Sequence, residues 1–413
     1  MNSSLFIAKK IIKASKTTKR NSQTIIRIAS IGTVLSTIIM ILTIFISYGF
    51  KNNILKKVRH FSSDIQVINY DANRSYDLAP VQLQESQKNK IIQIPNVSSI
   101  SGFITKPAIL KFKNNIEGVI LKSYEKDGNY SYIRESITEG IFPDFAQKEI
   151  LISEEISKKL HLHVGDPILL YFIQNPIRYR KLKVSGIYKT DIYEFDHLFA
   201  FVDINILQKI NTWDKDLMSG FEINLKEPLA LEETQQQIES VIRPAYFNSE
   251  HSNQLLKSLS IKERFAEFYF WFNLFDTNVI VIISLMITVA VINLISALLI
   301  VIIENMNMIG LLKSFGYENK SIRKVFMYFS VYLVLKGVFW GNIIALIIAY
   351  LQFEFHILPL DAKNYYISYV PIDFDWQGLF ILNSFAILLI ISLLLIPVNY
   401  ISRVSPIKVI RFN

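Results

Sequence analysis

The chain has 413 residues, of which 51% are hydrophobic and 19% are charged. It is too apolar for an ordinary soluble protein and too charged for membrane helices alone, so we expect a membrane part and an aqueous domain. The absence of cysteine excludes a disulfide framework, a thiolate zinc site and a cysteine nucleophile. The net charge of +9 does not indicate nucleic acid, because the basic residues gather beside apolar segments.

The first of these basic clusters lies near the N-terminus. The first 27 residues contain no acidic side chain, and their basic side chains are Lys9, Lys10, Lys13, Lys16, Lys19, Arg20 and Arg27. A basic run before an apolar segment sets membrane orientation, with the positive flank in the cytoplasm. Contact with anionic lipid is the alternative interpretation of these charges.

Four apolar stretches are long enough to cross about 30 Å of hydrocarbon, which takes about 20 residues. The expected segments are a basic amphipathic N-terminal segment (1–24), a first span (25–50), an outer α+β domain (51–276), a second span (277–303), a cytoplasmic loop (304–324), a third span (325–353), a short outer loop (354–377), a fourth span (378–401) and a cytoplasmic tail (402–413). The first span is too long for a signal peptide, and no small-residue cleavage site follows it, so we interpret it as a retained anchor.

The charges of the loops agree with this orientation. The 304–324 loop has more basic than acidic side chains, namely Lys313, Lys320, Arg323 and Lys324 against Glu304 and Glu318. The 354–377 loop is acidic, with Glu354, Asp361, Asp373 and Asp375 against Lys363. We therefore expect both termini and the 304–324 loop in the cytoplasm, and the 51–276 domain outside.

The outer domain contains short β-branched or alternating runs. These predict strands at 64–69, 149–153, 167–172 and 181–187. Helical spacing predicts helices at 154–160 and 229–242. The predicted fold is therefore a membrane protein with four transmembrane α-helices and a large α+β domain inserted between the first and second.

No catalytic signature occurs in the sequence. It lacks G-x-x-x-x-G-K-[ST], H-E-x-x-H and G-x-S-x-G, so we predict no catalytic residue and no cofactor in this chain. His161 and His163 have no evident third ligand, which favours surface or cap histidines over a metal site. An irregular site in the outer domain is the alternative left open.

The stretch 304–326 reads ENMNMIGLLKSFGYENKSIRKVF. Its apolar residues follow the i, i+3, i+4, i+7 spacing of an amphipathic helix, at Met308, Leu311, Leu312 and Phe315. Gly316 is suited to end this helix in a left-handed conformation, and Asn319 or Ser321 to cap the next. Such a helix either rests on lipid headgroups or docks into a groove of a cytoplasmic partner.

Two stretches, NLISAL at 293–298 and ENMNMIGLLKSFG at 304–316, resemble the signature of lipoprotein-releasing ABC transporter permeases (LolC/LolE-like). These permeases belong to the FtsX-like/MacB-like (type VII) superfamily. The resemblance continues in the same order through 5–10, Gly49–Phe50, 149–166, Pro397 and 402–412. It covers nearly the whole chain.

The resemblance implies a dimeric permease, homomeric or heteromeric, in a bacterial inner membrane, with a MacB-like periplasmic domain and a cytoplasmic ABC ATPase dimer that holds ATP and magnesium. Acylated lipoproteins would enter between the spans from the outer leaflet and leave to a periplasmic carrier. The 304–316 helix would be the coupling helix that docks on the ATPase. Its expected coupling residues are Glu304, Met308, Ile309, Gly310, Leu311, Leu312, Lys313, Phe315 and Gly316.

The chain departs from the family pattern in two places. Asn307 and Met308 stand where the family usually has Arg-Glu, so a charged contact with the ATPase is expected to be absent or replaced by apolar docking. The 173–180 loop is shorter than a hairpin that hooks the carrier in one type of family member. The residues that would contact a carrier here are Asn175, Pro176, Ile177, Arg178 and Tyr179.

Aromatic residues crowd the approach to the second span. They form either an interfacial aromatic belt or a lateral entry for lipoprotein acyl chains. The candidate entry residues are Tyr48, Phe50, Phe265, Phe268, Tyr269, Trp271, Phe272 and Phe275.

Lys336 lies within the third span, where a charge is costly. It either extends to the headgroups or makes a polar contact inside the bundle. Gly337 and Gly341 form a G-x-x-x-G pair that permits close helix packing.

Two other functions are weighed against lipoprotein release. One is an FtsX- or MacB-type mechanotransmitter that controls a periplasmic hydrolase or efflux partner. The other is a membrane-anchored binding module that uses no ATPase.

Overall fold

The computed structural model divides the chain into two compact units. The first unit comprises Met1–Asn52, Trp271–Pro359 and Val370–Asn413, and the second comprises Asn53–Phe270 and Leu360–Tyr369. The structure describes residues 3–14, 20–70, 76–125, 128, 130–144, 148–243, 255–365 and 367–400. The expected cytoplasmic tail at 402–413 lies outside these described residues.

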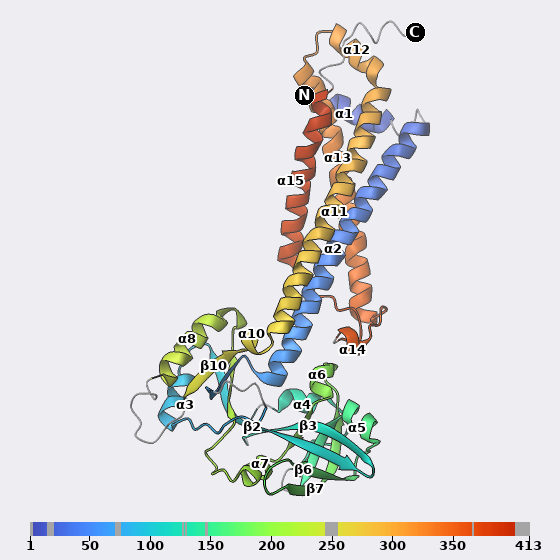
Figure 1. Cartoon of the computed structure of the whole chain (residues 1–413). Coiled ribbons are helices and arrows are strands. Elements are labelled where there is room, and N and C mark those ends of the chain that lie inside the picture. Colours follow the sequence, from blue (N-terminus) through green and yellow to red (C-terminus); the bar gives the residue numbers. More distant parts are fainter. Residues whose placement is uncertain are drawn as a thin grey trace. The chain divides into compact units, whose positions relative to one another are not determined.

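The first unit is helical (Figure 1). Its helices are α1 (Ser3–Ala14), α12 (Met306–Ser314), α13 (Asn319–Phe355) and α15 (Trp376–Tyr400). It also contains the part of α2 (Arg20–Ser62) up to Asn52 and the part of α11 (Ala266–Glu304) from Trp271 onward. Of the described helices, α2, α11, α13 and α15 are long and apolar enough to cross a membrane. The predicted number of spans is therefore confirmed.

All four of these helices extend beyond the predicted spans, α13 beginning at Asn319 rather than at 325 and α15 at Trp376 rather than at 378, and the extensions of α2 and α11 are the longest. The first span was expected to end at residue 50, but α2 continues to Ser62. Buried Ile54, Val58 and Phe61 follow the i, i+4, i+7 spacing of one helix face. A search for uncharged stretches misses this extension because Lys51, Lys56 and Lys57 lie on the same turns. In the same way, α11 begins at Ala266 rather than at 277.

Apolar side chains form the core of the helical unit. Phe45 of α2, Leu294 of α11, and Phe326 and Phe329 of α13 belong to one buried cluster. Ala8 on the amphipathic helix α1 joins this cluster. The Ser4 hydroxyl donates to the carbonyl of Ser321 at 3.2 Å, which attaches α1 to the beginning of α13.

The second unit is an α+β domain, as predicted. Its strands are β1 (Ile65–Asn69), β2 (Val97–Phe112), β3 (Asn115–Tyr124), β4 (Ile137–Gly140), β5 (Glu149–Ser153), β6 (Pro167–Phe172), β7 (Arg178–Tyr188), β8 (Phe199–Val202), β9 (Gly220–Leu225) and β10 (Leu256–Ser260). Its shorter helices are α3 (Glu85–Ile92), α4 (Ser131–Glu135), α5 (Glu154–Leu160), α6 (Tyr193–Asp196), α7 (Ile204–Asn211), η2 (Pro228–Ala230), α8 (Leu231–Ile242), α10 (Ile261–Arg264) and α14 (Ala362–Tyr365).

The long strand β2 takes part in two sheet regions. Its first half pairs with β9, which continues through β1 to the edge strand β10. Its second half pairs with both β3 and β6. Since β3, β8, β5, β7 and β6 also pair in that order, these strands and β2 close into a barrel. Figure 1 shows β2, β3, β6 and β7 together in this region.

Several predicted elements coincide with the observed ones. Strands β5 and β6 and helix α5 have the predicted bounds. The α5 boundary has a clear local cause, because the Ser153 side chain accepts from the Ile156 backbone N–H at 3.1 Å and so caps the helix. His161 ends α5 in the left-handed region with a φ of 56°.

Candidate functional site

The helix predicted within 304–316 is present as α12, and its coupling role stays a prediction. Helix α11 ends at Glu304, Asn305 precedes α12, and α12 runs from Met306 to Ser314. Ile309 and Gly310 are buried, and Ile309 belongs to the apolar cluster of the helical unit. This buried face attaches α12 to the bundle and leaves its opposite face open.

The exposed face of α12 differs from the predicted apolar stripe. Met308 and Leu312 pack against the bundle, whereas Leu311 is 59% exposed and Phe315 is 81% exposed. Helical periodicity places these four apolar side chains on one broad side of the helix. The bundle covers only the part of that side that carries Met308 and Leu312. Asn307 is also exposed, one helical turn before Leu311. The exposed face therefore presents two large apolar side chains beside Asn307. Lys313 lies half-buried on the same helix.

In the turn after α12, the predicted conformation of Gly316 is observed, but the predicted cap of the next helix is not. Gly316 has a φ of 82°, which is the left-handed conformation expected of a helix C′ residue. The prediction that Asn319 or Ser321 caps α13 is wrong, because Glu318 is the N-cap residue. The Glu318 carbonyl accepts from the backbone N–H groups of Ser321 and Ile322, and its side chain makes no cap bond.

The G-x-x-x-G pair of α13 lies against α2. A Cβ atom on Gly337 would come within 2.6 Å of Thr33 Cγ2, and one on Gly341 within 2.5 Å of Thr37 Cβ. Both threonine hydroxyls donate to carbonyls of their own helix at 2.9 Å, so they need no partner across the contact. Glycine at both positions allows the two backbones to approach this closely.

Lys336 lies on the other side of α13. It is exposed and lines a shallow groove together with Tyr332, Leu335, Val338, Phe339 and Asn342. The hypothesis of a polar contact inside the bundle is therefore not supported by its position. Asn342 instead provides the polar contact, because it and Asn383 of α15 exchange side-chain hydrogen bonds of 3.0 and 2.9 Å.

The candidate entry residues are divided between the two units. Phe50 of α2 packs against Trp271 and Phe275 of α11, with ring centroids 5.8 Å apart in both pairs. In the other unit, Phe265 packs against Phe195 and against Phe268. Three further candidates differ in exposure: Tyr48 is exposed, Tyr269 is half-buried and Phe272 is only 2% exposed.

The expected carrier-contact residues lie on the hairpin between β6 and β7. Ile177 and Tyr179 are exposed, and Asn175 and Pro176 lie in the turn before β7. Arg178 is held by the domain, because its guanidinium donates to the Lys209 and Ile210 carbonyls at 3.0 and 2.9 Å. The exposed side chains of Ile177 and Tyr179 therefore flank an arginine that is bonded to the rest of the domain.

Close contacts at Gly49 give a physical reason for the Gly49–Phe50 motif, which the sequence alone did not supply. A Cβ atom on Gly49 would come within 2.8 Å of the Pro371 carbonyl oxygen and 2.9 Å of the Asp373 backbone nitrogen. The Asn52 amide donates to the Asp373 carboxylate at 2.9 Å. This part of α2 is therefore packed closely against the segment that precedes α15.

Metal chemistry finds no support in the described part of the chain. Across its ranges, no three His, Asp or Glu side chains gather in a way that could hold a metal ion. The helices of the first unit form a packed apolar bundle, and α12 is one of several of its helices with exposed apolar side chains.

Two family models account for most of the chain. The model of the MacB-like periplasmic core domain matches residues 28–241. The model of the FtsX-like permease C-terminal matches residues 280–406. The chain belongs to the FtsX-like and MacB-like permease family. The family inferred from the 293–298 and 304–316 motifs is confirmed.

Named relatives of this permease align with it over most of their length. The chain is 23% identical over 387 residues to the lipoprotein-releasing system transmembrane protein LolC of Buchnera aphidicola from Schizaphis graminum, covering 90% of this chain and 89% of that protein. It is 21% identical over 345 residues to the lipoprotein-releasing system transmembrane protein LolE of Haemophilus influenzae, covering 79% of this chain and 80% of that protein.

A solved structure also matches part of the permease. The extracellular domain of the noncanonic ABC-type transporter YknZ from Gram-positive bacteria is 12% identical to this chain, with a TM-score of 0.34. The match covers 48% of this chain and 99% of that domain.

Proposed function

We propose that this permease is the membrane subunit of an ABC transporter that releases lipoproteins from the bacterial inner membrane. The observation that carries the proposal is the alignment with lipoprotein-releasing system proteins over about nine-tenths of both chains (90% and 89%). An exposed apolar face on α12 supports it, because a permease without its own nucleotide site needs a surface on which an ATPase can act.

The proposed orientation follows the distribution of charge. The basic N-terminal segment and the basic loop that contains α12 lie in the cytoplasm, and the α+β domain lies in the periplasm. A cytoplasmic ATPase dimer, which holds ATP and magnesium, docks on α12. Leu311 and Phe315 enter an apolar pocket of the ATPase, in place of the charged contact that Asn307 and Met308 cannot make.

The transport cycle then requires partners on both sides of the membrane. The working unit contains two permease subunits, as a homodimer or a heterodimer, embedded in membrane lipid. Acylated lipoproteins enter beside the exposed side chain of Tyr48. A periplasmic carrier is received at the hairpin tip that includes Ile177 and Tyr179.

Reconstitution tests the proposal directly. The permease, a second copy or a related permease chain, and an ABC ATPase are placed in proteoliposomes that contain a fluorescent triacylated lipoprotein. We expect the lipoprotein to appear in the supernatant only when Mg-ATP and a soluble carrier are both supplied. Controls use ADP, vesicles without the ATPase, and a lipoprotein that lacks its acyl chains.

The same experiment separates the two rival functions. ATP hydrolysis that depends on the permease but releases no lipoprotein would favour a mechanotransmitter that controls a periplasmic hydrolase or efflux partner. The FtsX-like and MacB-like domains fit that function as well. A permease that binds no ATPase even with α12 intact would instead be a membrane-anchored binding module.

A further inference from the structure

The last turn of α2 ends inside the α+β domain, where side chains from other elements bind its free carbonyl groups. The ammonium of Lys122 on β3 donates to the Phe61 carbonyl at 3.1 Å. The hydroxyl of Tyr124 donates to the same oxygen at 3.3 Å. The guanidinium of Arg264 on α10 donates to the Ser62 carbonyl at 2.6 Å. Carbonyls at a helix C-terminus lack partners within the helix and carry partial negative charge, which favours cations there.

Lys122 is buried together with its counter-ion. Its ammonium lies 2.8 Å from the Glu222 carboxylate of β9, and the two side chains are 3% and 4% exposed. The Gln66 amide of β1 donates to the same carboxylate at 2.8 Å. Burial lowers the pKa of Lys122, and the charge of Glu222 opposes that effect. The ion pair therefore links β3 to β9 across the intervening strand β2, and Gln66 adds β1, beside the end of α2.

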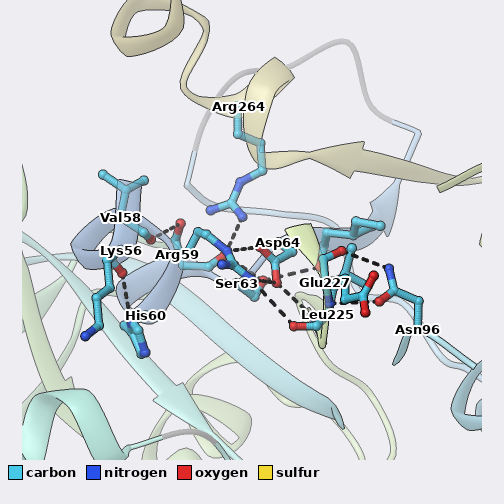
Figure 2. Close-up of polar contacts among 12 residues, drawn as sticks. Lys56, Val58, Arg59, His60, Ser63, Asp64, Asn96, Leu225, Glu227 and Arg264 are labelled. Carbon is cyan, nitrogen blue, oxygen red and sulfur yellow. Dashed lines mark hydrogen bonds and ion pairs between the residues drawn. The ribbon is translucent and has the colours of Figure 1, made fainter. Parts of the chain in front are cut away.

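Asp64, two residues after α2, adds a second set of bonds (Figure 2). Its carboxylate pairs with the guanidinium of Arg59 in the last turns of α2. The same carboxylate accepts from the backbone N–H of Leu225 on β9 at 2.8 Å. The Asp64 carbonyl accepts from the Ile261 N–H, which begins α10, at 2.8 Å. Figure 2 shows Arg264 approaching the same turn of chain.

These contacts join the segments that connect the domain to two membrane helices. Helix α2 contains the first span, and α10 ends two residues before α11, which contains the second. Arg264 and Asp64 link the end of α2 to α10, while Lys122 and Glu222 link it to the sheet. A buried ion pair is rarely more stable than apolar residues of the same size, but it requires one geometry. Stability alone therefore does not account for charges at this position.

We propose that Arg59, Asp64, Lys122, Glu222 and Arg264 form an anchor that fixes the ends of α2 and α10 to the sheet, so that movement of the membrane helices moves the domain. This inference rests on the proposed function, and it assigns to these residues a positioning role in lipoprotein release. The anchor binds neither substrate nor ATPase. Loss of the anchor therefore uncouples ATP hydrolysis from release without stopping hydrolysis.

The test uses the reconstituted transporter and two variants of the anchor. Arg264→Met removes the bond to Ser62, and Lys122→Met with Glu222→Gln removes both members of the buried pair, so that neither charge is left alone. We expect each variant to hydrolyse ATP within about twofold of the wild-type rate and to release roughly tenfold less lipoprotein per ATP. The matched control is Lys262→Met with Glu232→Gln, which removes the exposed 2.9 Å ion pair of α10 and leaves the release per ATP unchanged.

A distance measurement keeps the test independent of lipoprotein release. The sequence has no cysteine, so spin labels at Lys56→Cys on α2 and Glu267→Cys at the start of α11 report one distance. We expect a narrow distribution in the wild type and a broad one in Arg264→Met. If the double variant does not fold, Arg264→Lys, which keeps the charge on a shorter side chain, is used in its place.

The outcomes are distinct. Unchanged release per ATP in a folded anchor variant, or an unchanged distance distribution in Arg264→Met, overturns the anchor. A wild-type transporter that hydrolyses ATP but releases no lipoprotein overturns the proposed function instead, and the spin-label distances still test the anchor.

Discussion

A Cβ atom on Gly337 of α13 would lie 2.6 Å from Cγ2 of Thr33 on α2. Real Cβ atoms do not approach a neighbour this closely, so the contact between the two helices depends on glycine. Thr33 has little freedom to move away, because its hydroxyl is bonded to the Ala29 carbonyl at 2.9 Å and its β-branched side chain is restricted at χ1.

The first prediction concerns this contact. Gly337→Ala forces α2 and α13 apart, and overpacking of this kind costs about 1–3 kcal/mol. We expect a lower thermal unfolding temperature for the purified permease in detergent. Gly118→Ala is the matched control, because nothing lies within 4 Å of the Cβ that it adds. Equal unfolding temperatures for the two variants would contradict the close contact.

The second prediction concerns the exposed face of α12. Leu311→Glu with Phe315→Glu places two charges where the ATPase is proposed to bind. We expect at least a tenfold loss of ATPase co-purification with little change in unfolding temperature, because both side chains are exposed and removing them opens no cavity in the bundle. Leu229→Glu, at an exposed leucine of η2, is the control for an added surface charge. ATPase binding that survives the α12 changes would exclude this face as the docking surface.

The third prediction concerns lateral entry of acyl chains. Phe272→Asp does not test entry, because Phe272 is buried and a carboxylate there would also disrupt packing. Tyr48→Asp and Phe268→Asp are better variants, since Tyr48 is exposed and Phe268 is half-buried. We expect lost lipoprotein release with ATPase binding retained. Normal release by both variants would leave the aromatic residues with the role of an interfacial belt.

The sequence predicts best those features that depend on neighbouring residues. The bounds of α5 follow from the Ser153 cap, and the end of α12 follows from the conformational freedom of Gly316. The four spans follow from uncharged length. Each of these features is decided within a few residues of chain, so periodicity and composition are enough to find it.

Features that depend on distant segments could not be predicted in this way. The closed barrel requires β2 to pair with β3, β6 and β9, and no local pattern specifies such pairing. The G-x-x-x-G pair was visible in the sequence, but its partners Thr33 and Thr37 were not. The hydrogen bond from Arg264 to the Ser62 carbonyl joins residues 202 positions apart, and neither residue type signals the contact.

The last prediction concerns the pH dependence of stability. The Asp196 carboxylate is buried and accepts from the Thr190 backbone N–H at 3.0 Å, the Thr190 hydroxyl at 2.8 Å and the Asp191 N–H at 3.2 Å. Burial raises the pKa of Asp196 from 3.8 to about 6, and the bonds from Thr190 only partly oppose this. Between these two pKa values the folded state holds a proton that the unfolded state has released.

The folded state is therefore stabilised as the pH falls from above 6 towards 4, and it loses this contribution as the pH rises through 6. One unit of pKa corresponds to about 1.4 kcal/mol, so the full effect of Asp196 is on the order of 3 kcal/mol. Asp196→Asn cannot titrate and should remove most of this dependence. The measurement is the free energy of unfolding of the permease in detergent at intervals from pH 4.5 to 7.5. Asp216→Asn, at an exposed aspartate of the same domain, should keep the wild-type profile. A wild-type stability that rises with pH across this range relative to Asp196→Asn would show that the carboxyl is ionised at lower pH than its burial implies.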